Sequence, residues 1–209
     1  MSSTNRSNAR DNHVSDYYVT PPAAIFDLFK EMYNSNELTH LFLQDGTFRD
    51  DLKFLDPCAG GNPSSNDKGY NPPSYPYCLN KHGVDDNNIQ SIDIREDSLA
   101  KVKSDYIASE PILNRADIII TNPPFNVAVP IIKKAQLEVK DGGYVIMLLR
   151  LNFFGSKERA EFWKDNMPSV TFVHRKRISF LKGATDSIEY MHCVWIKGVN
   201  QNHTKLVII

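Results

Sequence analysis

The stretch RADIIITNPPF, residues 115–125, ends a run of apolar residues with an asparagine and two prolines. The apolar run is expected to form a buried strand that stops just before Asn122. Because prolines lack an N–H and fix φ, Pro123 and Pro124 make this strand end rigid and leave its carbonyls free. The side-chain oxygen of Asn122 and the carbonyl of Pro123 thus form a fixed pair of acceptors. Phe125 adds an aromatic face on which a ring can stack.

Two fixed acceptors beside an aromatic ring suit a planar amine that carries two N–H bonds. The exocyclic amine of a nucleobase is a poor nucleophile, because its lone pair is delocalised into the ring. Acceptance of both hydrogens draws the nitrogen towards tetrahedral geometry and returns the lone pair to it. Residues 122–125 therefore predict methylation of such an amine without its prior deprotonation.

A second Asn-Pro-Pro occurs at residues 71–73 and lacks this context. It follows DKGY rather than an apolar strand, and it leads into SYPY with no phenylalanine. We interpret it as an extended linker that enters a helix beginning near Ser74. The chain thus contains a candidate site at Asn122 and an internal comparison for it at Asn71.

Two further predicted strand ends carry residues that suit a nucleotide-like ligand. The first strand ends in DPCAGGN, where Gly60 and Gly61 allow a sharp turn that brings backbone amides close to a ligand. Asp56 in the same loop could accept from a ligand amine or an ordered water. The second strand ends at Asp93, an acid placed to accept both hydroxyls of a ribose. An ordinary tight turn and a helix-capping aspartate explain the same residues, and the absence of G-x-G-x-x-G counts against a dinucleotide.

Strands and helices alternate along the chain. Apolar and β-branched runs predict strands at 52–56, 88–94, 116–121, 144–154, 169–175, 187–198 and 205–209. Helical spacing and helix-end signals predict helices at 21–33, 98–102, 127–143 and 157–166, besides the one from Ser74. This alternation predicts an α/β fold with a mostly parallel, seven-stranded sheet covered by helices on both faces. Such sheets bind ligands at the carboxyl ends of their strands, where the residues described above are expected.

Composition limits the classes of protein that fit. The 209 residues suit one domain with a substantial core, and 41% hydrophobic and 23% charged residues are ordinary for a globular chain. The net charge of −1 excludes a globally basic protein, so a nucleic acid would be held by a local patch.

The cysteines and the apolar runs favour a cytoplasmic protein without a metal site. Cys58, Cys78 and Cys193 have no metal-binding spacing and are interpreted as free thiols of a reducing compartment. No apolar run approaches the length that crosses a membrane. Residues 1–16 are polar without the apolar segment of a signal peptide, and we expect them to form a flexible arm.

Taken together, these motifs resemble those of the S-adenosylmethionine-dependent adenine-N6 DNA methyltransferases, and most of all the small single-domain enzymes of phages and prophages. DPCAGG resembles the cofactor loop of that family, IDIRED its ribose-binding acid, and TNPPF its catalytic tetrapeptide. DYYVTPP resembles the segment that closes over the methionine part of the cofactor, and RISFLKGATDSIEYMHCVW resembles the closing strands and hairpin. The resemblance covers about residues 16–198 and implies a Rossmann-like class I methyltransferase fold over a single domain, 17–209.

The resemblance also implies a role for each matching residue. The S-adenosylmethionine site would comprise Tyr18, Thr20, Pro21, Asp56, Pro57, Cys58, Ala59, Gly60, Gly61, Asp93, Ile94, Asp105, Tyr106 and Asn122. Within it, Thr20 and Pro21 would lie at the methionine end and Asp105 near the adenine of the cofactor. The catalytic tetrapeptide would be Asn122, Pro123, Pro124 and Phe125, and it would hold an adenine that is flipped out of the duplex or single-stranded.

DNA is expected to contact the basic run that follows the strand at 169–175. Its candidate residues are Arg175, Lys176, Arg177 and Lys182, which would bind phosphate without sequence specificity. A solvated strand end explains the same charges. The chain departs from the family pattern in two ways, since Asn62 replaces a common third glycine and a separate target-recognition domain is absent. The second departure predicts a short or degenerate target.

The tetrapeptide leaves alternatives open. Adenine in RNA and the side chain of a protein glutamine also present a planar nitrogen with two N–H bonds. A catalytically silent subunit that keeps the fold and pairs with an active partner is a further alternative, against which the retained Asn122 and cofactor glycines count. The sequence does not indicate an oligomeric state. A phage-encoded enzyme would act in the host cytoplasm.

Overall fold

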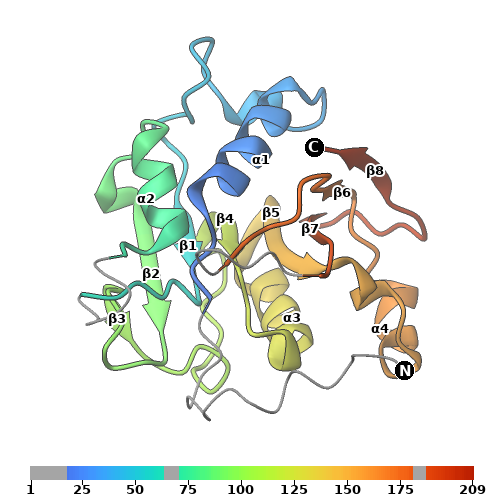
Figure 1. The fold of residues 1–209 in the computed structure, drawn as a ribbon. Helices are drawn as coiled ribbons and strands as arrows, with labels where there is room; N and C mark the ends of the chain where they lie inside the picture. The colour runs from blue at the N-terminus through green and yellow to red at the C-terminus, as the bar shows by residue number, and fades with distance from the viewer. Residues whose placement is uncertain (1–17, 64–70, 181–186) are drawn as a thin grey trace.

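The computed structural model describes residues 18–63, 71–180 and 187–209 (Figure 1). The predicted arm at 1–16 and the candidate DNA contact Lys182 lie outside these residues. The strands are β1 (Phe54–Asp56), β2 (Ile89–Asp93), β3 (Val102–Lys103), β4 (Ala116–Thr121), β5 (Val139–Arg150), β6 (Val170–Val173), β7 (Tyr190–Ile196) and β8 (Lys205–Ile208).

Four α-helices and five short 3-10 helices complete the described secondary structure. The α-helices are α1 (Pro22–Asn34), α2 (Ser74–Lys81), α3 (Ala128–Glu138) and α4 (Ala160–Asp165). The 3-10 helices are η2 (Thr39–Leu41), η3 (Asp86–Asn88), η4 (Phe125–Val127), η5 (Leu151–Phe154) and η6 (Lys157–Arg159). Within the described parts of the chain, none of the helices has the length and apolar character needed to cross a membrane.

In the described parts of the chain, the strands form one eight-stranded sheet in the order β3-β2-β1-β4-β5-β7-β6-β8. The first five strands along the chain pair in parallel, whereas β7 runs antiparallel to both β5 and β6. From β1 the chain builds outwards to β2 and β3, and then returns to β4 on the other side of β1. The order of the sheet therefore switches between β1 and β4, and ligands bind at such a point beside the carboxyl ends of the strands.

The side chains of each central strand divide between two apolar layers. In β4, Ile118 and Ile120 belong to a cluster that includes the buried residues of α1 and α2, whereas Ile119 belongs to a cluster with α3 and α4. This alternation follows from the two-residue period of a strand. Figure 1 shows α1 and α2 lying apart from α3 and α4, with the sheet between the two pairs. The mostly parallel sheet with helices on both faces is confirmed.

The predicted count of seven strands and the predicted helix at 98–102 are both wrong. This segment contains no helical turn and leads into β3, which pairs in parallel with β2 as the eighth strand. Its backbone donors bind outside the segment: the N–H of Leu99 donates to the carbonyl of Gly60 at 3.0 Å, and that of Lys101 to Ser91 Oγ at 2.9 Å. A helix would have required the same N–H groups for its own turns.

The helix predicted at 127–143 ends earlier, at Glu138, because Val139 already belongs to β5, where it pairs with Ala116 of β4. Gly142 and Gly143, at the end of the predicted helix, lie inside the strand, where the register with β4 shifts. Gly142 has a φ of +73°, and a Cβ on Gly143 would lie 2.7 Å from the carbonyl oxygen of Asp117. The glycine pair therefore allows an irregularity in β5. The predicted strand at 144–154 also ends four residues early, since η5 follows Arg150.

Candidate active site

A cavity of about 440 Å³ opens at the carboxyl ends of β1, β2 and β4. Its volume lies in the range of ligand-binding clefts. The predicted site residues that line it are Tyr18, Thr20, Pro57, Cys58, Ala59, Gly60, Gly61, Asp93, Ile94, Asp105, Tyr106, Asn122, Pro123, Pro124 and Phe125. The predicted residues Pro21 and Asp56 do not line it. The carbonyl of Pro21 accepts from the N–H of Ala24 at the start of α1, and Asp56 lies beneath the loop that follows β1.

Asp56 joins that loop to the end of β4. Its Oδ1 accepts from the hydroxyl of Thr121 at 2.5 Å and from the N–H of Cys58 at 3.1 Å. The side chain is buried, and its Oδ2 has no hydrogen-bond partner among the described residues. Burial, more than any other cause, raises the pKa of this carboxyl from 3.8 to about 7. Asp56 therefore fixes the residue that immediately precedes Asn122.

We expect Asp56 to make stability fall as pH rises. Its pKa in the folded chain is raised, so its contribution is complete below the ordinary pKa of 3.8 and is lost as pH rises through about 7. Asp56→Asn keeps the acceptor for Thr121 and removes the charge. Urea denaturation at several pH values should show the stability of the wild type falling relative to the variant over this range. Parallel stability curves would contradict the raised pKa.

The turn after β1 is attached to β2 through Asp93. One oxygen of Asp93 accepts from the N–H of Gly60 at 2.7 Å, and the other accepts from the N–H of Arg95 at 2.8 Å. Gly60 and Gly61 have φ values of +64° and +84°, which glycine adopts without strain. Each carboxylate oxygen of Asp93 can accept more than one hydrogen bond, so the acid can hold the loop and still accept from a ligand hydroxyl.

Asn122 lies at the carboxyl end of β4 with its amide nitrogen already engaged. Its Nδ2 donates to the hydroxyl oxygen of Thr20 at 3.1 Å, and Thr20 is buried just before α1. This contact turns the amide so that its oxygen remains as the acceptor for a ligand. Thr20, which the resemblance placed at the cofactor, thus also orients the amide of the tetrapeptide.

Phe125 has a neighbour that the sequence did not suggest. The guanidinium carbon of Arg150 lies 4.6 Å from the centre of the Phe125 ring, and both residues line the cavity. The Nε of Arg150 is buried without a hydrogen-bond partner among the described residues. Arg150 ends β5, so the rule that ligands bind at strand ends could have identified it. The other cavity residues that sequence reasoning missed are Val19, Ser74, Tyr75, Arg95, Ile107, Asn126, Val127 and Ile131.

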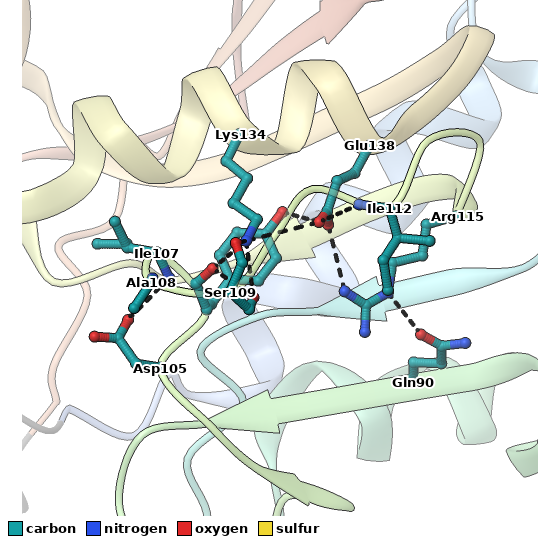
Figure 2. Close-up of polar contacts among 10 residues, drawn as sticks. Gln90, Asp105, Ile107, Ala108, Ser109, Ile112, Arg115, Lys134 and Glu138 are labelled. Atoms are coloured by element: carbon teal, nitrogen blue, oxygen red, sulfur yellow. Dashed lines mark hydrogen bonds and ion pairs between the residues drawn. The ribbon is translucent and has the colours of Figure 1, made fainter.

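The segment 105–107, which forms one wall of the cavity, is held by side chains that extend from α3 (Figure 2). Lys134, whose side chain is 8% exposed, donates to the carbonyls of Tyr106 and Ser109. The fully buried Glu138 accepts from the hydroxyl of Tyr106 at 2.9 Å and from the N–H of Ile112 at 3.0 Å. Burial, together with Glu138, raises the pKa of Tyr106.

The same segment is also closed locally. Asp105 Oδ1 accepts from the N–H groups of Ile107 and Ala108 at 2.9 and 3.2 Å, contacts that Figure 2 shows at the exposed end of the network. At the other end, Arg115 lies 3.5 Å from Glu138 and donates to Gln90 at 2.9 Å. The wall that carries Asp105 is therefore fixed by charged and polar groups along most of its length.

The second Asn-Pro-Pro lies outside the cavity, as its sequence context indicated. The backbones of Asn71 and Asn62 exchange two hydrogen bonds, of 2.7 and 3.0 Å. Pro73 immediately precedes α2, which begins at Ser74. This arrangement confirms the linker and helix predicted there, and it brings Tyr75 to the cavity.

The basic run emerges at the same edge of the sheet as the cavity. β6 runs parallel to β5, since both are antiparallel to β7, so its carboxyl end faces the cavity edge. Arg175, Lys176 and Arg177 follow it with exposed side chains, and Arg177 pairs with Glu189 at 3.1 Å. Phe180 then packs against Tyr18, a cavity residue, with ring centres 5.6 Å apart. The basic side chains do not line the cavity themselves.

The chain matches no protein-family model and no curated protein sequence. Its fold is similar to a protein from Listeria monocytogenes described as a class I S-adenosylmethionine-dependent methyltransferase, with a TM-score of 0.59 and 13% identity over 91% of this chain and 65% of that chain. The M protein of the type I restriction enzyme EcoKI has a TM-score of 0.53 and 12% identity, over 76% of this chain and 44% of that chain. A protein from Pyrococcus horikoshii described as an RNA methyltransferase has a TM-score of 0.53 and 15% identity, over 91% of this chain and 92% of that chain.

These likenesses establish the fold of the chain. The strand order and the alternation of helices are those of a Rossmann-like class I methyltransferase fold, which confirms the fold class expected from the sequence. The chain spans 65% and 44% of the length of the first two of these proteins.

Proposed function

We propose that the chain transfers a methyl group from S-adenosylmethionine to the exocyclic N6 amine of adenine in DNA. The observation that carries this proposal is the orientation of Asn122 in the cavity. Thr20 accepts from its nitrogen, so the amide oxygen and the neighbouring carbonyl of Pro123 remain as acceptors for a target amine. Phe125, on the same cavity wall, supports the same assignment because it can stack on the target base.

The cavity fits S-adenosylmethionine as the cofactor. Gly60 and Gly61 supply the close backbone turn, and a Cβ on Gly61 would lie 2.8 Å from Leu99 Cβ. Asp93 would accept from the ribose, Asp105 and Tyr106 would flank the adenine, and the segment 18–20 would cover the methionine end. When bound there, this cofactor supplies an electrophilic methyl group, and the electrons of the broken sulfur–methyl bond would stay on sulfur in the thioether product S-adenosylhomocysteine.

The residues of the chain would then activate and position the target. Asn122 and Pro123 accept the two hydrogens of the N6 amine, which returns the lone pair to nitrogen and directs it at the methyl carbon. Phe125 fixes the plane of the base by stacking. The methylated nitrogen carries one hydrogen too many and releases it as a proton, so a general base need not act before transfer.

Gly61→Ala should weaken cofactor binding, and Gly46→Ala should leave it unchanged. Both glycines have a φ of +84°, so both substitutions cost backbone strain of about 1 kcal/mol. An added Cβ meets nothing within 4 Å at Gly46, but at Gly61 it meets Leu99 Cβ at 2.8 Å and Pro73 Cδ at 3.0 Å. Calorimetric titration with S-adenosylmethionine should show roughly tenfold or greater loss for Gly61→Ala. Equal affinities of the two variants would remove the turn from the cofactor site.

Arg175 and Arg177 would bind the DNA backbone. Replacement of both by Ala should weaken DNA binding and reduce the slope of log affinity against log salt by up to about 2, because each phosphate contact contributes about 0.9. Cofactor affinity should not change. Arg49→Ala is the matched control. Arg49 is ion-paired with Asp51 as Arg177 is with Glu189, but it precedes β1 at the opposite edge of the sheet. A salt slope unchanged from the wild type would place the DNA surface elsewhere.

The direct test of the proposed reaction is product analysis. The wild-type chain is incubated with DNA and S-adenosylmethionine that carries a labelled methyl group, and the DNA is digested to nucleosides. We expect the label in N6-methyldeoxyadenosine. Label in N4-methyldeoxycytidine, or none in DNA, would contradict the proposal.

A further inference from the structure

A continuous chain of buried polar side chains extends from Asn122 into the core. Asn122 Nδ2 donates to Thr20 Oγ1 at 3.1 Å. Thr20 and Tyr75 both line the cavity, and the Thr20 side chain acts on the Tyr75 hydroxyl to lower its pKa against the larger, opposite effect of burial. The Tyr75 hydroxyl lies 2.9 Å from Nε2 of His192, and Nδ1 of His192 lies 2.8 Å from Nε2 of His174. This series of side chains thus connects the end of β4 with the segment before α1, with α2, with β7 and with the residue that follows β6.

The four side chains beyond Asn122 are almost completely enclosed. The exposed fractions of Thr20, Tyr75, His192 and His174 are 2%, 2%, 0% and 4%. Polar groups in such a position are costly unless each is hydrogen-bonded. Thr20 accepts from Asn122, and Tyr75, His192 and His174 are hydrogen-bonded in series. Burial lowers the pKa of His174 to about 4, and burial followed by the neighbouring His174 lowers that of His192 well below its usual value. Both rings are therefore neutral near pH 7.

A neutral imidazole donates from one nitrogen and accepts at the other, so the hydrogen bonds of this series all run in one direction from donor to acceptor. In the first direction Asn122 donates to Thr20, Thr20 to Tyr75, Tyr75 to His192 Nε2, and His192 Nδ1–H to His174. In the opposite direction His174 donates to His192, His192 Nε2–H to Tyr75, Tyr75 to Thr20, and Thr20 to the oxygen of Asn122. The second direction turns the Asn122 amide over and presents its N–H groups to the cavity.

We propose that the tautomers of His192 and His174 position the Asn122 amide, through Tyr75 and Thr20, so that its oxygen faces the target amine. The structure has Asn122 Nδ2 as the donor to Thr20, which corresponds to the first direction. In that direction His192 carries its proton on Nδ1, and His174 accepts at Nε2. The two histidines are positioning residues, because they lie outside the cavity and act through Tyr75 and Thr20.

This inference rests on the proposed function only for its effect on catalysis. If Asn122 accepts the hydrogens of an amine, the first direction is the active one, and the second places donors against donors. The direction itself is a property of the folded chain and can be measured without any substrate.

The first test reads the tautomers directly. In ¹⁵N-histidine-labelled wild-type protein near pH 7.5, two-bond ¹H–¹⁵N spectra distinguish a protonated ring nitrogen from an unprotonated one, and His192→Gln provides the assignment. We expect His192 to carry its proton on Nδ1 and to have Nε2 unprotonated. A proton on Nε2 of His192 would overturn the proposal, even if the chain methylates DNA.

The second test reverses the direction with two variants at one position. In His174→Gln the side-chain oxygen can accept from His192, whereas in His174→Lys the side chain can only donate. We expect kcat of His174→Gln to stay within about threefold of the wild type, and that of His174→Lys to fall roughly tenfold or more, the worth of about one hydrogen bond to the amine. The affinity for S-adenosylmethionine should be unchanged in both, because His174 does not line the cavity.

An equal loss of kcat in the two variants would mean that His174 has a purely structural role, and it would overturn the proposal. If His174→Lys does not fold, the tautomer measurement on the wild type decides alone. A wild type that binds S-adenosylmethionine but methylates no DNA would contradict the proposed function. The tautomer measurement would still test the direction of the hydrogen bonds.

Discussion

Asn122→Ala should abolish methyl transfer while the affinity for S-adenosylmethionine stays within a few-fold of the wild type. In the proposed reaction the side-chain oxygen of Asn122 accepts from the target amine, whereas its nitrogen already donates to Thr20. Loss of this oxygen removes one of the two acceptors that return the lone pair to nitrogen. Transfer measured with labelled cofactor, combined with calorimetric titration, separates the two effects.

The chain offers its own control for this variant at the second Asn-Pro-Pro. In Asn71→Ala the backbone bonds to Asn62 remain, and the cavity lining is unchanged. We expect this variant to keep activity within a few-fold. Loss of cofactor binding in Asn122→Ala would assign Asn122 a structural role, and an active Asn122→Ala would exclude it from the chemistry.

Glu138→Ala should give the largest loss of stability. The fully buried carboxylate accepts from Tyr106 and Ile112 and lies 3.9 Å from the buried ammonium of Lys134. Removal of one partner of a buried ion pair leaves the other charge uncompensated, which typically costs about 3–5 kcal/mol. Chemical denaturation should show this loss. Any fraction that remains folded should also bind S-adenosylmethionine more weakly, because the wall that carries Asp105 loses its hydrogen bonds to Glu138.

The exposed pair of Glu161 and Lys164 is the matched control for Glu138→Ala. These side chains are 81% and 65% exposed and 2.6 Å apart on α4, where water screens the charges. Glu161→Ala should therefore change the free energy of unfolding by less than about 1 kcal/mol. Similar losses in the two variants would show that the network below the cavity contributes no more than a surface ion pair.

The sequence predicted most of the cavity because its residues occupy strand ends. The apolar run before Asn122 and the glycines after Asp56 are local patterns, and the rule for parallel sheets brings them to one edge. The preceding apolar strand distinguishes the Asn-Pro-Pro at residues 122–124 from the one at residues 71–73. That distinction needed no tertiary information, and the structure places the two segments as expected.

The sequence could not predict features that depend on contacts between distant segments. Residues 98–102 have helical spacing, yet the N–H of Leu99 donates to Gly60 in the turn after β1, and that of Lys101 donates to Ser91 in β2. The glycines at 142 and 143 look like a helix stop, but the close carbonyl of Asp117 makes them part of a strand irregularity. Tyr75 and His192 are 117 positions apart, and no local pattern predicts that they meet.

The central claim is that the target of the cavity is adenine in DNA, and a competition between substrates tests it most directly. Wild-type protein is given S-adenosylmethionine with a labelled methyl group and an equal mixture of DNA, RNA and cell protein. Each fraction is then separated and digested. We predict the label in N6-methyldeoxyadenosine of the DNA fraction, in amounts that vanish with Asn122→Ala. Label chiefly in RNA or in methylated glutamine would contradict the account.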